Sequence, residues 1–172
     1  MAAEVSQMKQ RVPRRTWSSS GLAGRRPRLL VEDGRPAAAV SDFSLFRAAG
    51  FDVAFCGGPE GGPGDCPLLG GRRCMLVDHA DVVLHGLDPR LGVAAAIRNQ
   101  RPELPVVVEQ SRERVGTAEP LPAGCVPLGY PCSVHGQIDA LLRAEAAARG
   151  GAGSAIVGVW TTTRSSRSPI RA

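Results

Sequence analysis

Short apolar runs alternate with segments of helical periodicity between residues 29 and 148, and this order constrains the fold more than any other feature. Regular spacing of apolar residues predicts helices over 36–49, 92–99 and 133–148. The five apolar runs expected to be strands are 29–31, 53–55, 81–84, 105–108 and 125–128. Strand–helix alternation predicts a parallel sheet with helices on its faces. Five strands at this spacing favour a flavodoxin-like, doubly wound α/β fold with strand order 2-1-3-4-5.

The alternation is interrupted between the second and third strands, where a doubly wound fold has a helix. Ten of the fifteen residues from 57 to 71 are Gly or Pro, and both residue types disfavour a helix interior. We therefore expect a Gly/Pro/Cys-rich loop to replace the second helix.

Basic residues are concentrated at the two ends of the chain, whose formal net charge is +5. Residues 1–28 hold seven basic side chains and one acidic one, and residues 144–172 hold four basic and one acidic. The segments 1–27 and 149–172 have little apolar periodicity, so we expect them to be disordered tails around a folded domain over 28–148. The tails are interpreted either as weak binders of anions or nucleic acid, or as solvated ends with no fixed role.

Hydrophobic patterning and cysteine usage bear on the compartment. No apolar run approaches the length of a membrane-spanning helix, and none accompanies the basic residues near the start as in a signal peptide. The five cysteines are odd in number and include no C-x-x-C pair, which is typical of a chain from a reducing compartment. We therefore expect a cytoplasmic protein that does not enter a membrane.

Residues 28–145 resemble the receiver domain of bacterial response regulators in the order of four motifs. The motifs are RLLVED at 28–33, ADVVLHGLDP at 80–89, RPELPVVV at 101–108 and GYP at 129–131. They resemble the first, third and fourth strands of that family and the end of its fifth strand. The resemblance implies the fold above and a site at the carboxyl ends of the strands, where the family binds Mg²⁺ beside an aspartate that accepts a phosphoryl group.

Three positions of that site depart from the family. The phosphoacceptor position falls on Gly86, which has no nucleophile. The family's Ser/Thr position falls at Gln110 or Ser111, and its lysine position falls on Tyr130, which supplies no cation. The resemblance therefore implies a degenerate receiver, or pseudo-receiver, in which the phosphorylation chemistry is lost.

The acidic pair Glu32 and Asp33 is the part of the family's site that this chain keeps. Two carboxylates without further ligands are expected to bind Mg²⁺ weakly at most. Asp88, two residues past Gly86, is an alternative phosphoacceptor only if its loop folds back toward the metal. The resemblance also implies a cis peptide bond between Tyr130 and Pro131, with a structural role.

Four cysteines and one histidine form a second candidate site. The residues that the topology brings toward one edge of the sheet are Cys56, Cys66, Cys74, Cys132 and His85. Thiolate and imidazole ligands suit Zn²⁺ or an iron–sulfur cluster, whereas a pair of thiols can form a redox-responsive disulfide. The spacing matches no common zinc pattern, so Cys56 and Cys125 are also interpreted as small buried core residues.

No nucleophile elbow, Walker-type phosphate loop or zinc-protease motif occurs in the sequence, so we expect no enzymatic activity. We predict a stand-alone pseudo-receiver that acts as a signalling or regulatory interaction module without aspartyl phosphorylation. Its partner, or a second copy, is expected on the family's interaction face: the fourth strand, the following segment, the fifth strand and the last helix. The alternative is a thiol-based metal or redox sensor built on loop 56–74. A third interpretation, a small-molecule pocket at the strand ends, has no residue assigned to it.

Overall fold

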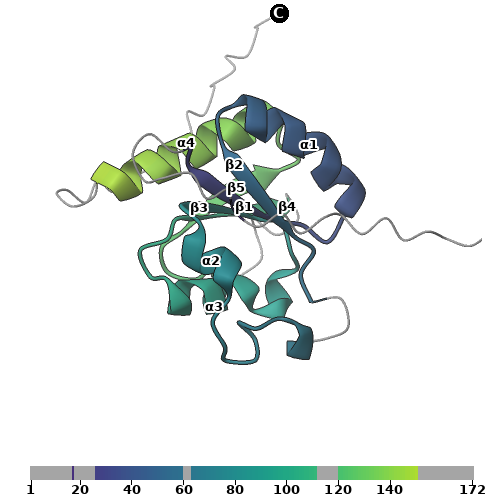
Figure 1. Ribbon diagram of the computed structural model, residues 1–172, viewed down its shortest axis with the longest axis vertical. Helices are drawn as coiled ribbons and strands as arrows, with labels where there is room; N and C mark the ends of the chain where they lie inside the picture. Colours follow the sequence, from purple (N-terminus) through teal and green to yellow (C-terminus); the bar gives the residue numbers. More distant parts are fainter. Residues whose placement is uncertain (1–16, 18–25, 60–62, 112–119, 151–172) are drawn as a thin grey trace, which may run out of the picture.

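A five-stranded parallel sheet forms the centre of the computed structural model, which describes residues 17, 26–59, 63–111 and 120–150 (Figure 1). The strands are β1 (Arg28–Glu32), β2 (Asp52–Cys56), β3 (Val82–His85), β4 (Val106–Ser111) and β5 (Cys125–Tyr130). Their order is β2-β1-β3-β4-β5, and every pairing is parallel. This order confirms the doubly wound arrangement expected from the sequence. Both β4 and β5 extend beyond the predicted runs at their carboxyl ends.

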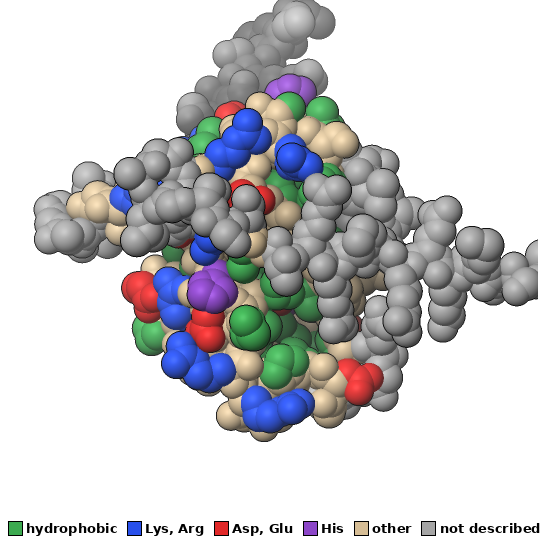
Figure 2. Space-filling model, viewed as in Figure 1, with side chains coloured by type: hydrophobic (Ala, Val, Ile, Leu, Met, Phe, Trp, Pro, Cys, Tyr) green, Lys and Arg blue, Asp and Glu red, His purple; other side chains and the backbone are tan. Residues whose placement is uncertain are grey.

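Helices cover both faces of the sheet. On one face lie α1 (Pro36–Ala48) and α4 (Val134–Gly150), and on the other lie α2 (Met75–His79) and α3 (Val93–Gln100) (Figure 1). Short 3-10 helices occur at Pro63–Asp65 and Pro89–Leu91. Hydrophobic side chains reach the surface on the part of the molecule that holds α2 and α3, with charged side chains around them (Figure 2).

The central strands are buried on both sides, which explains why their sequences read as continuous apolar runs. Successive strand residues point to opposite faces. Leu29 and Val31 accordingly pack into a cluster under α1 and α4, whereas Leu30 packs into a second cluster under α2 and α3. Val107 and Val108 of β4 divide between the two clusters in the same way. Burying one such side chain contributes about 1.5–3 kcal/mol to folding.

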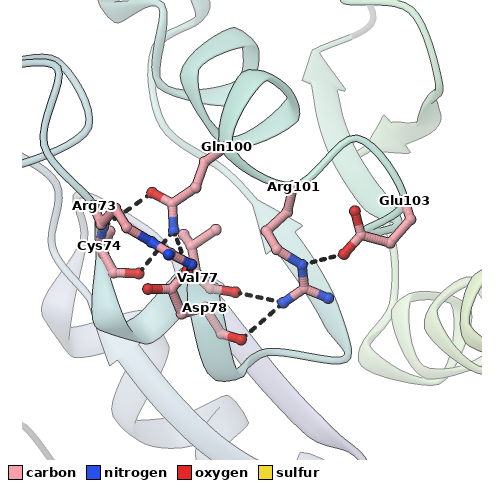
Figure 3. Close-up of polar contacts among 7 residues, drawn as sticks. All are labelled: Arg73, Cys74, Val77, Asp78, Gln100, Arg101 and Glu103. Carbon is pink, nitrogen blue, oxygen red and sulfur yellow. Dashed lines mark hydrogen bonds and ion pairs between the residues drawn. The ribbon is translucent and has the colours of Figure 1, made fainter.

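A five-residue helix, α2, follows the Gly/Pro-rich loop, although the sequence predicted only a loop in place of the second helix. Val77 anchors α2 in the core with no solvent exposure. Arg101 donates hydrogen bonds to the carbonyl oxygens of Val77 and Asp78 at the end of α2 (Figure 3). Gln100 exchanges hydrogen bonds of 2.9 and 3.2 Å with the backbone of Cys74 and donates to Asp78 at 2.7 Å. Contacts from α3 therefore hold α2 in place.

Part of the segment expected to be a basic tail packs on the folded domain. Trp17 lies against the cluster under α2 and α3, and the guanidinium carbon of Arg28 is 5.7 Å from the centre of its ring. The backbone N–H of Asp52 donates to the carbonyl oxygen of Pro27 at 2.8 Å. Most of the two expected tails lies outside the described residues. Within the described ranges, no helix is long and apolar enough to span a membrane.

Candidate functional site: a carboxylate cavity closed by Arg35

The carboxyl ends of the strands border a cavity of about 160 Å³ on the α1 and α4 side of the sheet. This edge of a doubly wound sheet is where such folds bind ligands. The polar residues lining it are Glu32, Asp33, Arg35, Asp42, Glu109, Tyr130, Cys132 and Gln137, together with Gly86. The site therefore combines the carboxylates of Asp33, Asp42 and Glu109 with the guanidinium of Arg35.

The carboxylate of Glu32 contacts the imidazole of His85 on the face of the sheet that Leu30 and Val83 share. The two residues are direct partners in the β1–β3 register. The His85 Nδ1 atom lies 2.7 Å from Glu32 Oε2, and the side chains are 0% and 3% exposed. The other imidazole nitrogen, Nε2, is buried and has no hydrogen-bond partner among the described residues. Because both side chains are buried, each depends on the other for this contact.

Asp33 is saturated by Arg35, two residues later. The backbone N–H and the Nε of Arg35 donate to Asp33 Oδ1 at 2.8 and 3.0 Å, and a terminal nitrogen donates to Oδ2 at 2.9 Å. This fork-to-fork geometry is the strong form of an Arg–carboxylate pair. The turn after β1 therefore places the Arg35 guanidinium against the carboxylate of Asp33, the residue that follows the strand.

Arg35 also contacts Tyr130 and Glu109, two other residues that line the cavity. Its second terminal nitrogen donates to the Tyr130 hydroxyl at 2.8 Å, and its guanidinium carbon lies 5.2 Å from the centre of the Tyr130 ring. Glu109 Oε2 is 3.9 Å from the same guanidinium. The hydrogen bonds to Asp33 and then to Tyr130 raise the pKa of Arg35 further above its usual value. Arg35 is thus a fixed positive charge at the mouth of an acidic site.

Glu109 reaches from β4 toward Gly86. A Cβ at Gly86 would lie 3.1 Å from Glu109 Oε2 and 3.3 Å from the Glu32 carbonyl oxygen, so the absence of a side chain makes room for this carboxylate. Gln137 of α4 donates to the other oxygen of Glu109. Burial raises the pKa of Glu109, with smaller opposing effects from the Gln137 hydrogen bond and from Arg35. Burial likewise raises the pKa of Asp42.

The structure separates the other residues of the first predicted site. Gln110 does not line the cavity; Glu109 does, because alternate residues of β4 face opposite sides and Glu109 shares the side of Val107. The Ser111 side chain lies outside the described part. The Asp88 carboxylate accepts a 3.0 Å hydrogen bond from the Arg90 backbone N–H and caps a 3-10 helix. Asp88 is not among the residues that line the cavity. The expected cis bond between Tyr130 and Pro131 is present.

The five residues of the predicted metal site lie in different places. Cys132 lines the cavity, and His85 pairs with Glu32. Cys56, Cys66 and Cys74 pack on the opposite side of the sheet, against the cluster under α2 and α3. Across the described ranges, no three or more His, Cys, Asp or Glu side chains are grouped to hold a metal ion. All five cysteines are free and half-buried.

Sequence reasoning missed Arg35, Asp42, Glu109 and Gln137. For Glu109 a signal was available, since it continues the alternation of a strand whose Val107 is buried on the α4 side. Arg35 follows the acidic pair so closely that a contact with Asp33 was also foreseeable. The contribution of Gln137 depends on how α4 packs over β4, which no local pattern encodes.

Comparison with known proteins identifies the architecture. No family model and no curated protein matches the sequence. A response regulator receiver domain protein from Clostridium thermocellum matches the structure with a TM-score of 0.54 and 16% identity, over 72% of this chain and 97% of that one. This chain has a receiver-like fold.

Two further solved structures agree with this architecture. A CheY-like receiver protein from Methanospirillum hungatei matches with a TM-score of 0.52 and 13% identity, over 73% of this chain and 98% of that one. Full-length FixJ from B. japonicum matches with a TM-score of 0.51 and 16% identity, over 74% of this chain and 62% of that one. Gly86 and Tyr130 both border the Arg35 cavity.

Proposed function

We propose that this protein is a non-catalytic, receiver-like signalling module that binds a protein partner and is not switched by aspartyl phosphorylation. The observation that carries the proposal is the position of Arg35, which binds Asp33, contacts Tyr130 and faces Glu109. In this interpretation a side chain of the protein itself supplies the positive charge that an acidic receiver site otherwise takes from a metal ion.

The cavity offers little to a divalent cation. Both oxygens of Asp33 accept hydrogen bonds from Arg35, and Glu32 is directed to His85. Mg²⁺ prefers several oxygen ligands and retains waters. To bind the Asp33 carboxylate in addition to another ligand of the site, it must displace Arg35. We therefore propose that Mg²⁺ binds weakly and is not needed for function.

Phosphoryl transfer to this chain also lacks its acceptor. Gly86 carries no carboxylate, and the space a side chain would need is filled by Glu109. Glu109 is itself engaged by Gln137 and half-buried. A covalent aspartyl phosphate requires an available carboxylate nucleophile held in line with the phosphodonor, and this arrangement does not support one.

The proposed partner surface lies along β5 and α4. Val126 on β5 and Leu142 on α4 are 41% and 42% exposed, and Tyr130 at the end of β5 is 36% exposed. β5 is an edge strand, and Pro127 in its middle limits uncontrolled strand addition. Apolar side chains on an edge strand and on the neighbouring helix give a protein partner, or a second copy of this chain, a hydrophobic surface beside the Arg35 cavity.

Exposure to acetyl phosphate or beryllofluoride with Mg²⁺ tests the switching part of the proposal. Intact-mass measurement after acetyl phosphate treatment is expected to show no phosphoryl adduct. Two-dimensional amide NMR with beryllofluoride is expected to show no shift at Gly86, Glu109 or Tyr130. A phosphoryl adduct, at Glu109 or at any other carboxylate, contradicts the proposal.

Association measurements test the partner surface. Sedimentation of the full chain over a range of concentrations, with Val126→Asp and Leu142→Asp beside it, is expected to show weaker self-association in both variants. Leu45→Asp is the matched control, because Leu45 is 46% exposed on α1, away from β5. If the chain is monomeric, crosslinking with a partner replaces sedimentation; equal loss in all three variants counts against the β5–α4 surface.

A further inference from the structure

Three half-buried thiols gather on the side of the sheet that carries α2 and α3. Cys56 ends β2, Cys66 follows the first 3-10 helix, and Cys74 directly precedes α2. All three pack against the same apolar cluster and are free. Burial raises the pKa of Cys56 to about 11, and charges on Glu32, Cys74 and Cys66 contribute in the same direction. The three thiols therefore lie close enough to influence one another.

The chain between Cys66 and Cys74 folds back on itself. The backbone N–H of Gly70 donates to the Cys66 carbonyl at 3.1 Å, and that of Arg72 donates to the Pro67 carbonyl at 2.8 Å. The bond between Arg72 and Pro67 closes the turn. Cys66 directly precedes Pro67 and Cys74 lies two residues after Arg72, so the two cysteines lie on opposite arms at nearly equal distances from the closing bond. A disulfide requires Cα atoms within about 7 Å of each other, and the arms of such a turn are suited to that separation.

The two arms differ in how firmly they are held. Gln100 fixes the backbone of Cys74 through its N–H at 2.9 Å and its carbonyl at 3.2 Å (Figure 3). Cys66 begins the turn, and its carbonyl oxygen accepts the Gly70 N–H within that turn. Cys56, whose thiol stays protonated near neutral pH, is a poor nucleophile because thiol–disulfide exchange needs the thiolate. The turn that places Cys66 and Cys74 on its two arms selects these two as the pair.

We propose that Cys66 and Cys74 form a reversible disulfide by exchange with a low-molecular-weight disulfide such as oxidised glutathione. The thiolate of one cysteine attacks the small disulfide, forms a mixed disulfide and releases one small thiol. The second cysteine then attacks the protein sulfur of that mixed disulfide and releases the other small thiol. Two electrons pass from the cysteines to the small disulfide, and the two cysteine protons end on the released thiols.

The described geometry favours this disulfide over a metal site. Although four cysteines, including Cys125, pack against the cluster, no group of three or more potential ligands in the described ranges is placed to hold a metal ion. A disulfide needs two sulfur atoms only, and it would join the turn to the start of α2. This inference concerns the face opposite to the Arg35 cavity and does not depend on the function proposed for that cavity.

The test is equilibration of the full chain in buffers of increasing oxidised-to-reduced glutathione ratio, followed by acid quenching and alkylation under denaturing conditions. Two of the five thiols are expected to become unreactive together. Trypsin is expected to give a crosslinked pair of the peptides 48–72 and 74–90, which reduction separates. Because the first peptide holds both Cys56 and Cys66, Cys56→Ser is included and is expected to leave the crosslink intact.

Cys66→Ser and Cys74→Ser are each expected to abolish the crosslink, and Cys132→Ser is the matched half-buried control that leaves it unchanged. Circular dichroism checks the fold of each variant, with Cys66→Ala as the replacement if Cys66→Ser unfolds. The proposal is overturned if all five thiols remain reactive at the most oxidising ratio. It is equally overturned if the crosslink survives in either variant, or if only intermolecular disulfides form.

Discussion

The carboxylate of Glu32 and the imidazole of His85 meet 2.7 Å apart, from directly paired positions of β1 and β3, with both side chains almost wholly excluded from solvent. Neither strand sequence signals this pair, since each residue simply follows an apolar run. Asp33, the next residue after Glu32, instead binds Arg35 in the turn after β1. Adjacent acidic residues, Glu32 and Asp33, thereby acquire two different partners and face different surroundings.

Loss of one member of the buried pair is expected to destabilise the protein strongly. His85→Leu leaves the Glu32 carboxylate buried without its partner, which costs about 3–5 kcal/mol of unfolding free energy in comparable cases. The double variant Glu32→Leu/His85→Leu is expected to recover most of that loss, because two apolar side chains need no mutual compensation. Urea denaturation of the three proteins measures both effects. If His85→Leu lowers the unfolding free energy by less than about 1 kcal/mol, the two side chains do not depend on each other.

Arg35→Ala is expected to strengthen Mg²⁺ binding. The substitution frees both oxygens of Asp33 and removes a positive charge that faces Glu109. Because the Arg35 side chain is 52% exposed, its competition is treated as that of a partly screened ion pair, worth about 1 kcal/mol and therefore about fivefold in affinity. Calorimetric titration with Mg²⁺ measures the change, and Arg35→Lys is the control that keeps the charge but loses the two-point contact. Equal Mg²⁺ affinity in Arg35→Ala and the native protein is incompatible with Arg35 acting as the internal cation.

The sheet was predictable from sequence because it depends on a local signal. Runs such as Leu29–Val31 are continuous and apolar, and strands buried on both faces have that pattern. The Gly/Pro-rich loop was predictable for the same reason, since it has few ways to be helical. The helix α2 was not, because five residues have too little propensity to be recognised and depend on Gln100 and Arg101 for their position.

Sequence reasoning predicted only some of the residues of the candidate site. Family resemblance indicated Glu32, Asp33, Gly86 and Tyr130, and all four border the cavity. It gave no indication of Arg35, because the motifs that carry the resemblance do not include this position. The cysteines show the opposite error. Sequence order brought Cys132 toward Cys56, but they lie on different sides of the sheet, and only packing decides the side.

Glu109 is expected to make stability depend on pH in a recognisable direction. Burial raises its pKa in the folded protein above the ordinary value of 4.5. At pH values between the ordinary pKa and the raised one, the folded protein therefore binds more protons than the unfolded chain. Stability therefore decreases as the pH rises through that interval and is regained on acidification. Glu109→Gln removes this titration while still offering an oxygen to Gln137. Unfolding free energies measured from about pH 4 to about pH 7 should show the variant gaining on the native protein as pH rises. A constant difference across that range would mean that Glu109 ionises alike in both states.

Arg101 is expected to control the order of α2. It caps the carbonyl oxygens of Val77 and Asp78 with bonds of 3.2 and 2.8 Å (Figure 3). Removing the cap leaves two terminal carbonyls without these donors, and a hydrogen bond of this kind contributes about 0.5–1.5 kcal/mol. Arg101→Ala should therefore lower the unfolding free energy by about 1–3 kcal/mol and speed amide exchange at residues 75–80 more than in β1. Glu103→Gln is the control, because Glu103 contacts Arg101 from a position that is 65% exposed and contributes little to the cap. If exchange at residues 75–80 does not change in Arg101→Ala, the burial of Val77 and the Gln100 contacts suffice to hold α2, and the Arg101 cap is dispensable.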